Sequence, residues 1–146
     1  MKNLDTVMRI AKYIRRRTVQ YHITKYNYDS HDVDLAGWCA HTTNILFEEL
    51  HRRGIRSTLR WNGLHCFLTY GKWIIDITAT QFDSNQPKVV KVARGSIESN
   101  AFWWKETDKA STLKERKASR GWATFPDNWN GEWQKQMRKS LKRLKN

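Results

Sequence analysis

LHCFLTYGKWIIDIT (residues 64–78) predicts a β-hairpin, because two runs rich in aromatic, leucine and β-branched residues flank a single glycine. Glycine favours the first central position of a two-residue type II′ turn, which places the loop at Gly71–Lys72. That loop pairs Tyr70 with Trp73 and so sets the register of both strands. The register in turn decides which side chains share a face of the sheet.

The predicted register gives the hairpin one apolar face and one polar face. The apolar face carries Leu64, Cys66, Leu68, Trp73, Ile75 and Ile77. On the other face His65 and Asp76 become diagonal neighbours, with Cα atoms roughly 7–8 Å apart, within reach of an imidazole and a carboxylate. Asp76 in an otherwise apolar strand needs a partner, because burying an unpaired carboxylate is costly. Cys66 is predicted to be a core residue rather than a catalyst.

Apolar residues at helical spacing predict two helices before the hairpin. The first is indicated by Leu4, Val7, Met8, Ala11 and Ile14. We expect this helix to end near Arg15–Arg17, because cations suit the carboxyl end of a helix dipole. A loop is expected over residues 25–37. The second helix, AGWCAHTTNILFEELHRRG (residues 36–54), is amphipathic, and Gly54 is the natural residue beyond its end.

The remaining segments predict an α+β fold. Strand signals also occur at 55–61 and 87–93, whereas residues 96–128 are irregular, charged and aromatic. A C-terminal helix is marked by an apolar stripe of Trp129, Trp133, Met137, Leu141 and Leu144. The order predicts a single domain over 1–146, in which N-terminal helices pack on a small antiparallel sheet. A Trp-rich, basic C-terminal extension covers about 96–146.

The composition excludes several classes of protein. Apolar residues make up 39% of the chain, which includes 8 Trp, and this argues against disorder. No run of about 18 apolar residues occurs, so no membrane span is expected. The N-terminus has no segment of signal-peptide type. Two cysteines are too few for a disulfide framework, which predicts a reducing, cytoplasmic location.

The net charge of +13 predicts an acidic partner: an acidic protein or peptide substrate, a nucleic acid or an anionic membrane surface. The cations are dense on the C-terminal helix. There the predicted anion-binding patch consists of Arg138, Lys139, Lys142 and Arg143. The simpler interpretation is a solvated face that serves solubility, and charge alone does not choose between the two.

Cys39 lies where a helix N-terminus favours thiolate, because free backbone N–H groups and the helix dipole attract negative charge. A thiol nucleophile also needs a base and a third group that orients the base. His41 and His51 share the helix of Cys39, but they lie on another face or about three turns away. His65, paired with Asp76, is the better-placed base.

The order of these residues resembles that of the transglutaminase-like branch of the papain-like cysteine enzymes. GWCAHT (residues 37–42) is similar to the nucleophile segment of that family. Residues 64–82 are similar to the His and Asp hairpin of its small bacterial members, including the D-x-T-A-x-Q-F end. The resemblance implies a papain-like core, with Cys39 as nucleophile, His65 as base and Asp76 as the orienting group. It implies peptidase, deamidase or amide-transfer chemistry on a protein or peptide, or an inactive relative of these enzymes, and no cofactor is expected.

The residue that would bind the oxyanion or the substrate stays open in the sequence. One oxyanion donor is expected to be the backbone N–H of Cys39. The candidates for a further donor or substrate-binding side chain are Trp38, Gln20 and Gln81.

Two alternatives to a catalytic triad follow from the same residues. One is a zinc site made by Cys39, His41, His65 and Cys66. This spacing fits no common zinc site, so no metal is expected. The other is a basic nucleic-acid-binding protein whose cysteine, histidine and aspartate are structural. Steep salt dependence of nucleic-acid binding, without thiol reactivity, would identify it.

Overall fold

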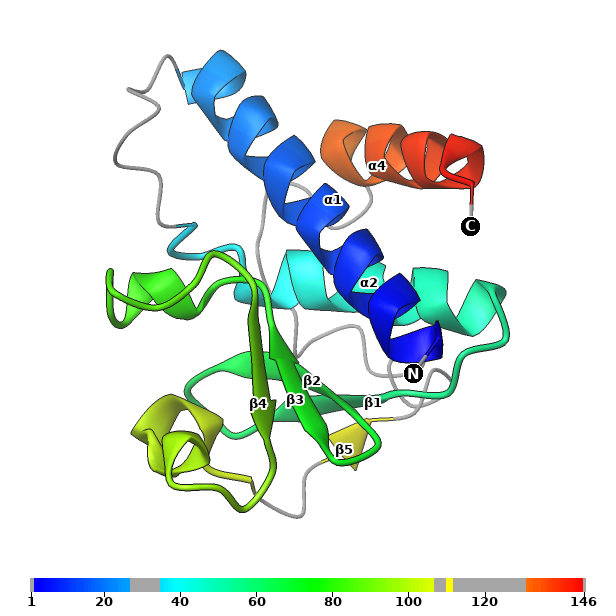
Figure 1. Ribbon diagram of the computed structural model, residues 1–146. Coiled ribbons are helices and arrows are strands. Elements are labelled where there is room, and N and C mark those ends of the chain that lie inside the picture. The colour runs from blue at the N-terminus through cyan, green and yellow to red at the C-terminus, as the bar shows by residue number, and fades with distance from the viewer. Residues whose placement is uncertain (1, 27–34, 107–109, 112–130, 146) are drawn as a thin grey trace.

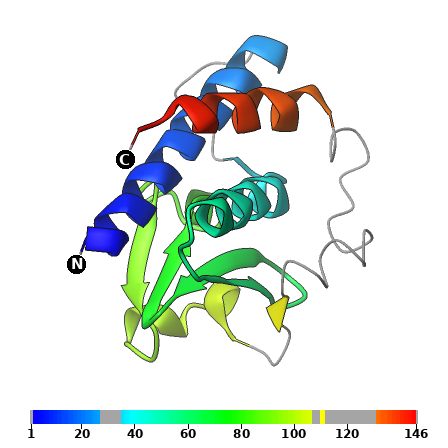
Figure 2. The same ribbon diagram turned by 90° about the vertical axis from the view of Figure 1, so that its right-hand side faces the viewer.

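Three helices lie on one side of an antiparallel sheet in the computed structural model, which describes residues 2–26, 35–106, 110–111 and 131–145 (Figures 1 and 2). The helices are α1 (Lys2–Tyr26), α2 (Cys39–Arg52) and α4 (Glu132–Arg143). Helix α2 packs on the sheet, and α1 and α4 contact α2. The fold class is therefore α+β, as the sequence predicts.

The sheet has the strand order β4-β3-β2-β1-β5, and every neighbouring pair is antiparallel. The strands are β1 (Thr58–Trp61), β2 (Cys66–Tyr70), β3 (Trp73–Asp76), β4 (Val90–Ala93) and β5 (Ala110–Ser111). The predicted strand within 87–93 is thus present as β4. The central pair, β2 and β3, is the hairpin that the sequence singles out.

The predicted hairpin register is confirmed. Tyr70 pairs with Trp73 across the two-residue loop. Gly71 has φ +55, whereas Lys72 is not among the residues with positive φ, as a type II′ turn requires. Cys66, Leu68, Ile75 and Ile77 of the predicted apolar face are buried in the main core, whereas Leu64, predicted on the same face, is 52% exposed. His65 and Asp76 consequently face the opposite side of the sheet.

The predicted end of the first helix near Arg15–Arg17 is wrong, because α1 continues to Tyr26. Arg15 does not serve as an exposed helix end. Its guanidinium is buried and donates to the carbonyl of Ile77 at 2.7 Å, which ties α1 to the chain after β3. Thr18 is also fully buried in the helix interior, and its hydroxyl donates to the Ile14 carbonyl at 2.7 Å. Arg15 therefore marks packing rather than a helix end, and α1 includes the first two residues of the expected loop, Lys25 and Tyr26.

Residues 96–128 are not wholly irregular, in contrast to the prediction. Two 3₁₀ turns occur there, η3 (Glu98–Asn100) and η4 (Phe102–Trp104), and β5 follows. Residues 112–130, and with them Trp129 of the predicted apolar stripe, lie outside the described residues. The rest of the stripe is confirmed, because Trp133, Met137 and Leu141 are buried in the main core.

A second, smaller apolar cluster covers the outer face of the sheet. It consists of Phe67, Ile74, Ala79, Val90, Trp103 and Trp104. The two tryptophans come from η4, which lies against this face (Figure 1). The cluster matters for function, because it encloses the polar pair on the same face of the hairpin.

Candidate active site

Cys39 is the first residue of α2, as the sequence predicts. The helix begins after Trp38, whose carbonyl accepts the first helical hydrogen bond from the N–H of Thr42 at 2.9 Å. The backbone N–H of a first-turn residue has no carbonyl partner within its own helix. Cys39 is 8% exposed, whereas Cys66 is fully buried, and neither cysteine is in a disulfide. The thiol of Cys39 therefore lies beside helix N–H groups at the edge of the core.

His65 and Asp76 form a fully buried ion pair. Nε2 of His65 lies 2.8 Å from Oδ2 of Asp76, and both side chains have no exposed surface. Because a carboxylate only accepts, the imidazole nitrogen is the donor. The ring of His65 also packs edge-on against Phe82, with ring centroids 4.8 Å apart. Water is excluded from this bond, which strengthens it electrostatically.

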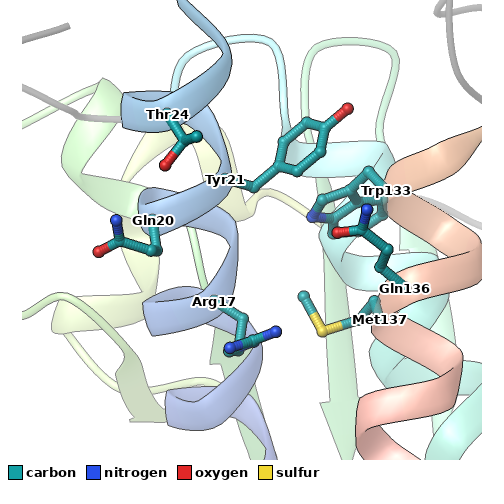
Figure 3. Close-up of a pocket in the computed structure, with 7 residues that line it drawn as sticks. All are labelled: Arg17, Gln20, Tyr21, Thr24, Trp133, Gln136 and Met137. Atoms are coloured by element: carbon teal, nitrogen blue, oxygen red, sulfur yellow. The ribbon is translucent and has the colours of Figure 1, made fainter. Parts of the chain in front are cut away.

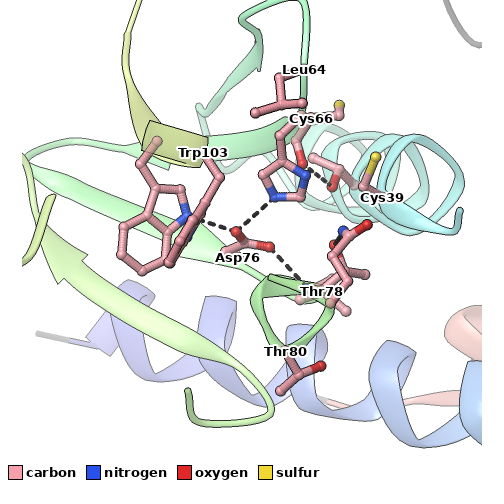
Figure 4. A network of polar contacts seen from close by, with 12 residues as sticks. Cys39, Leu64, Cys66, Asp76, Thr78, Thr80 and Trp103 are labelled. Atoms are coloured by element: carbon pink, nitrogen blue, oxygen red, sulfur yellow. Dashed lines mark hydrogen bonds and ion pairs between the residues drawn. The ribbon is translucent and has the colours of Figure 1, made fainter. Parts of the chain in front are cut away.

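The other ring nitrogen of His65 is left for Cys39. Nδ1 is buried and has no hydrogen-bond partner among the described residues. Burial lowers the pKa of His65, whereas the charge and hydrogen bond of Asp76, and then the side chain of Cys39, raise it, to about 9 overall. Cys39 is thus close enough to His65 to raise its pKa, and Nδ1 is the ring nitrogen that Asp76 leaves unoccupied. Figure 4 shows Cys39 at the start of α2 together with the contacts that converge on Asp76.

Asp76 accepts three hydrogen bonds. Besides His65, the indole N–H of Trp104 donates to the same oxygen, Oδ2, at 2.6 Å. The backbone N–H of Thr78 donates to the other oxygen, Oδ1, at 2.9 Å. These bonds hold the carboxylate in one orientation and leave it little freedom to turn away from the imidazole.

Asn62 links the loop that carries His65 to the turn that carries Trp104. Its Oδ1 accepts from the backbone N–H of His65 at 2.8 Å and from that of Leu64 at 3.0 Å. Its Nδ2 donates to the carbonyls of Trp103 and Lys105, each at 3.1 Å. One side-chain amide therefore holds both segments that converge on Asp76.

The other three predicted site residues, Trp38, Gln81 and Gln20, take no part in the contact between His65 and Asp76 among the described residues. The indole N–H of Trp38 donates to Nδ1 of His22 at 3.1 Å, so that donor is engaged away from Cys39. Gln81 is in the 3₁₀ turn η2 (Ala79–Gln81), and its amide donates to Oγ1 of Thr78 at 3.0 Å. Gln20 lines a cleft between α1 and α4 (Figure 3). None of these three has a hydrogen bond to His65 or Asp76 within the part of the chain that the structure describes.

His41 belongs to a separate cluster, although it is close to Cys39 in sequence. Its ring packs against both Trp38 and Trp133, and Nδ1 accepts from the side-chain amide of Gln134 at 3.0 Å. Burial lowers the pKa of His41 to about 4, so this imidazole is neutral at physiological pH. Within the described ranges, no group of three or more His, Cys, Asp or Glu side chains gathers as metal ligands.

No family model, curated protein or solved structure matches the chain. These comparisons therefore neither support nor oppose the resemblance to transglutaminase-like enzymes. Among the helices that the structure describes, none is both long and apolar enough to cross a membrane.

Two residues of the site, Trp104 and Asn62, were not predicted from the sequence. The pair Asn62–Gly63 is typical of a turn, but such a pattern does not reveal a side chain that bridges two loops.

Proposed function

We propose that the chain is a thiol-dependent acyl-transfer enzyme that acts on an amide bond, with Cys39, His65 and Asp76 as its triad. The observation that carries the proposal is the buried 2.8 Å contact between Nε2 of His65 and Asp76. This contact leaves Nδ1 for a thiol that begins a helix. A base, a group that orients it and a nucleophile are the three parts that such catalysis requires.

The chemistry follows from these positions. Nδ1 of His65 takes the thiol proton of Cys39, the sulfur attacks the carbonyl carbon of the amide, and the backbone N–H at the start of α2 stabilises the developing oxyanion. The C–N bond then breaks, and the imidazolium of His65 gives its proton to the leaving amine. A thioester on Cys39 results. Water or a second amine attacks the thioester, His65 takes the proton from that nucleophile, and the thiol is regenerated.

The substrate class and the location belong to the same proposal. The resemblance to transglutaminase-like enzymes favours a protein or peptide amide as the substrate. A free Cys39 thiol must stay reduced to react, which suits the reducing cytoplasm. Hydrolysis, deamidation and transfer differ only in which amine leaves and which nucleophile attacks the thioester.

The test uses a glutaminyl peptide with hydroxylamine as the acceptor, followed by mass spectrometry of the peptide and of the intact protein. We expect a hydroxamate, a deamidated or a cleaved product, and an acyl group trapped on Cys39. Cys39→Ala should abolish all of these, whereas Cys66→Ala, a matched control in the core, should not. An inert Cys39 in a folded protein that binds nucleic acid would instead favour the alternative, in which the triad residues are structural.

A further inference from the structure

Helices α1 and α4 lie side by side and run antiparallel (Figures 1 and 2). Arg9 near the start of α1 donates to the carbonyl of Lys145 beyond the end of α4. Farther along α1, Arg17 donates to Oγ of Ser140 at 3.4 Å. Between the helices lies a cleft, lined among others by Arg17, Tyr21 and Trp133 (Figure 3).

The cleft contains an unused hydrogen-bond donor. Trp133 is 1% exposed, and its indole N–H has no hydrogen-bond partner among the described residues. Figure 3 shows that this nitrogen is turned towards α1, on the side where the guanidinium of Arg17 lies. A buried donor without a partner is costly, and an acceptor that enters the cleft would remove that cost. The pairing of an indole N–H with an arginine fits an anionic oxygen.

Rows of exposed cations border the cleft. On α1 the row contains Arg16 and Arg17, which lie three or four residues before Gln20 of the cleft and so share its face. On α4 Lys139 lies three residues after Gln136 of the cleft, and Arg143 lies four residues after Lys139, so they share one helix face. Arg17, Lys139 and Arg143 form no ion pair within the described part of the chain.

Each of these helices has a single acidic residue, which lies in its first turn, and Glu132 shares the face of Gln136. Glu132, the only acidic residue of α4, is in its first turn and accepts from the amide of Gln136 at 2.8 Å. Asp5 is in the first turn of α1. Glu48 of α2 binds Arg138 at 3.1 Å, so Arg138 of the predicted anion-binding patch is already paired, unlike Lys139 and Arg143. The unpaired positive surface is therefore centred on Arg17, Lys139 and Arg143.

We propose that the α1–α4 cleft and its bordering cations bind the phosphates of a nucleic-acid backbone. The 12 residues of α4 extend over about 18 Å, and a nucleic acid offers a regular line of anions over such a length. An acidic protein would have to place carboxylates in a similar row. Insertion of α4 into a membrane is disfavoured, because its apolar stripe is buried in the core.

This surface is separate from the thiol site, so its test is independent of the proposed enzyme activity. The charge variant is Arg17→Gln with Lys139→Gln. The matched control is Arg56→Gln with Lys91→Gln, which removes the same charge from exposed residues outside the two helices. Binding of labelled single-stranded and duplex oligonucleotides is measured by fluorescence anisotropy over 50–200 mM salt, together with alkylation of Cys39.

We expect the Arg17 and Lys139 variant to bind the oligonucleotides at least tenfold more weakly than the control. For the duplex, a plot of log K against log salt has a negative slope, to which each phosphate contact contributes roughly 0.9. In the Arg17 and Lys139 variant this slope should become shallower by about 2. Alkylation of Cys39 should be unchanged. Equal weakening in both double variants would overturn the proposal, and so would polyglutamate or phosphatidylserine vesicles that bind as tightly as the oligonucleotides.

A second pair of variants tests the indole donor. Trp133→Phe removes the N–H in the cleft, whereas Trp73→Phe removes another unpartnered indole N–H, which lies on β3. We expect only Trp133→Phe to weaken oligonucleotide binding several-fold, at equal helicity by circular dichroism. Equal binding by both folded variants would show that the indole takes no part. If Trp133→Phe does not fold, the charge variants decide the proposal.

Discussion

The indole N–H of Trp104 donates to Oδ2 of Asp76 at 2.6 Å, and this oxygen also accepts from His65. Trp104 is separated from Asp76 by 28 residues and comes from a 3₁₀ turn on the outer face of the sheet. The tryptophan therefore limits where the carboxylate can lie, and through it the orientation of the imidazole. Positioning of this kind is often supplied by groups that never touch the substrate.

Trp104→Phe should destabilise the native state and slow the chemistry of Cys39. A hydrogen bond to a charged group contributes about 1.5–3 kcal/mol, so the free energy of unfolding should fall by about that amount. The matched control is Trp103→Phe, because the neighbouring indole N–H has no hydrogen-bond partner among the described residues. Urea denaturation and the alkylation rate of Cys39 measure both effects. Equal losses in the two variants would mean that only ring volume matters.

Asn62→Asp should weaken the link between the two loops. The carboxylate keeps the acceptor for the His65 N–H but cannot donate to the carbonyls of Trp103 and Lys105. It would also face those carbonyl oxygens with a negative charge. We expect a loss of about 1–3 kcal/mol in the free energy of unfolding. The control is Asn100→Asp, at an exposed position in η3. A variant as stable as this control would contradict the proposed link.

The raised pKa of His65 predicts a dependence of stability on pH. Folding raises the pKa from 6.5 to about 9, so the stabilisation is fully present below pH 6.5 and is lost as the pH rises through about 9. The difference corresponds to about 3 kcal/mol, since one pKa unit is 1.36 kcal/mol. Asp76→Asn removes the charge that raises the pKa.

The measurement is the free energy of unfolding of wild type and Asp76→Asn between pH 6 and pH 10. The difference in the free energy of unfolding between wild type and Asp76→Asn should be largest near pH 6 and should decrease towards pH 10. Because both proteins share all other titrating groups, the difference isolates the pair. A gap that is constant with pH would show that His65 does not change charge in this range.

The sequence was most informative where local chemistry determines structure. The glycine turn at Gly71 and the two-residue period set the hairpin register, so the contact between His65 and Asp76 was predictable. The position of Cys39 followed from helical periodicity and the end signal at Gly54. These features depend on neighbours within a few residues.

The features that the sequence did not reveal depend on distant contacts. The full length of α1 reflects the burial of Arg15, whose partner carbonyl belongs to Ile77, 62 residues away. Trp104 and Asn62 each act through loops that meet only in the folded chain. No local pattern distinguishes a tryptophan that binds a carboxylate from one that fills a core, because both are buried.

The most direct test of the triad is alkylation of the native protein by iodoacetamide near pH 6, mapped to each cysteine by mass spectrometry. The account predicts that Cys39 reacts well before Cys66, and that His65→Asn slows Cys39 at least tenfold without unfolding the protein. Cys66, fully buried on the apolar face of the hairpin, should react only on unfolding. Preferential labelling of Cys66, or a Cys39 rate that is the same in wild type and folded His65→Asn, would contradict the assignment of Cys39 and His65 as nucleophile and base.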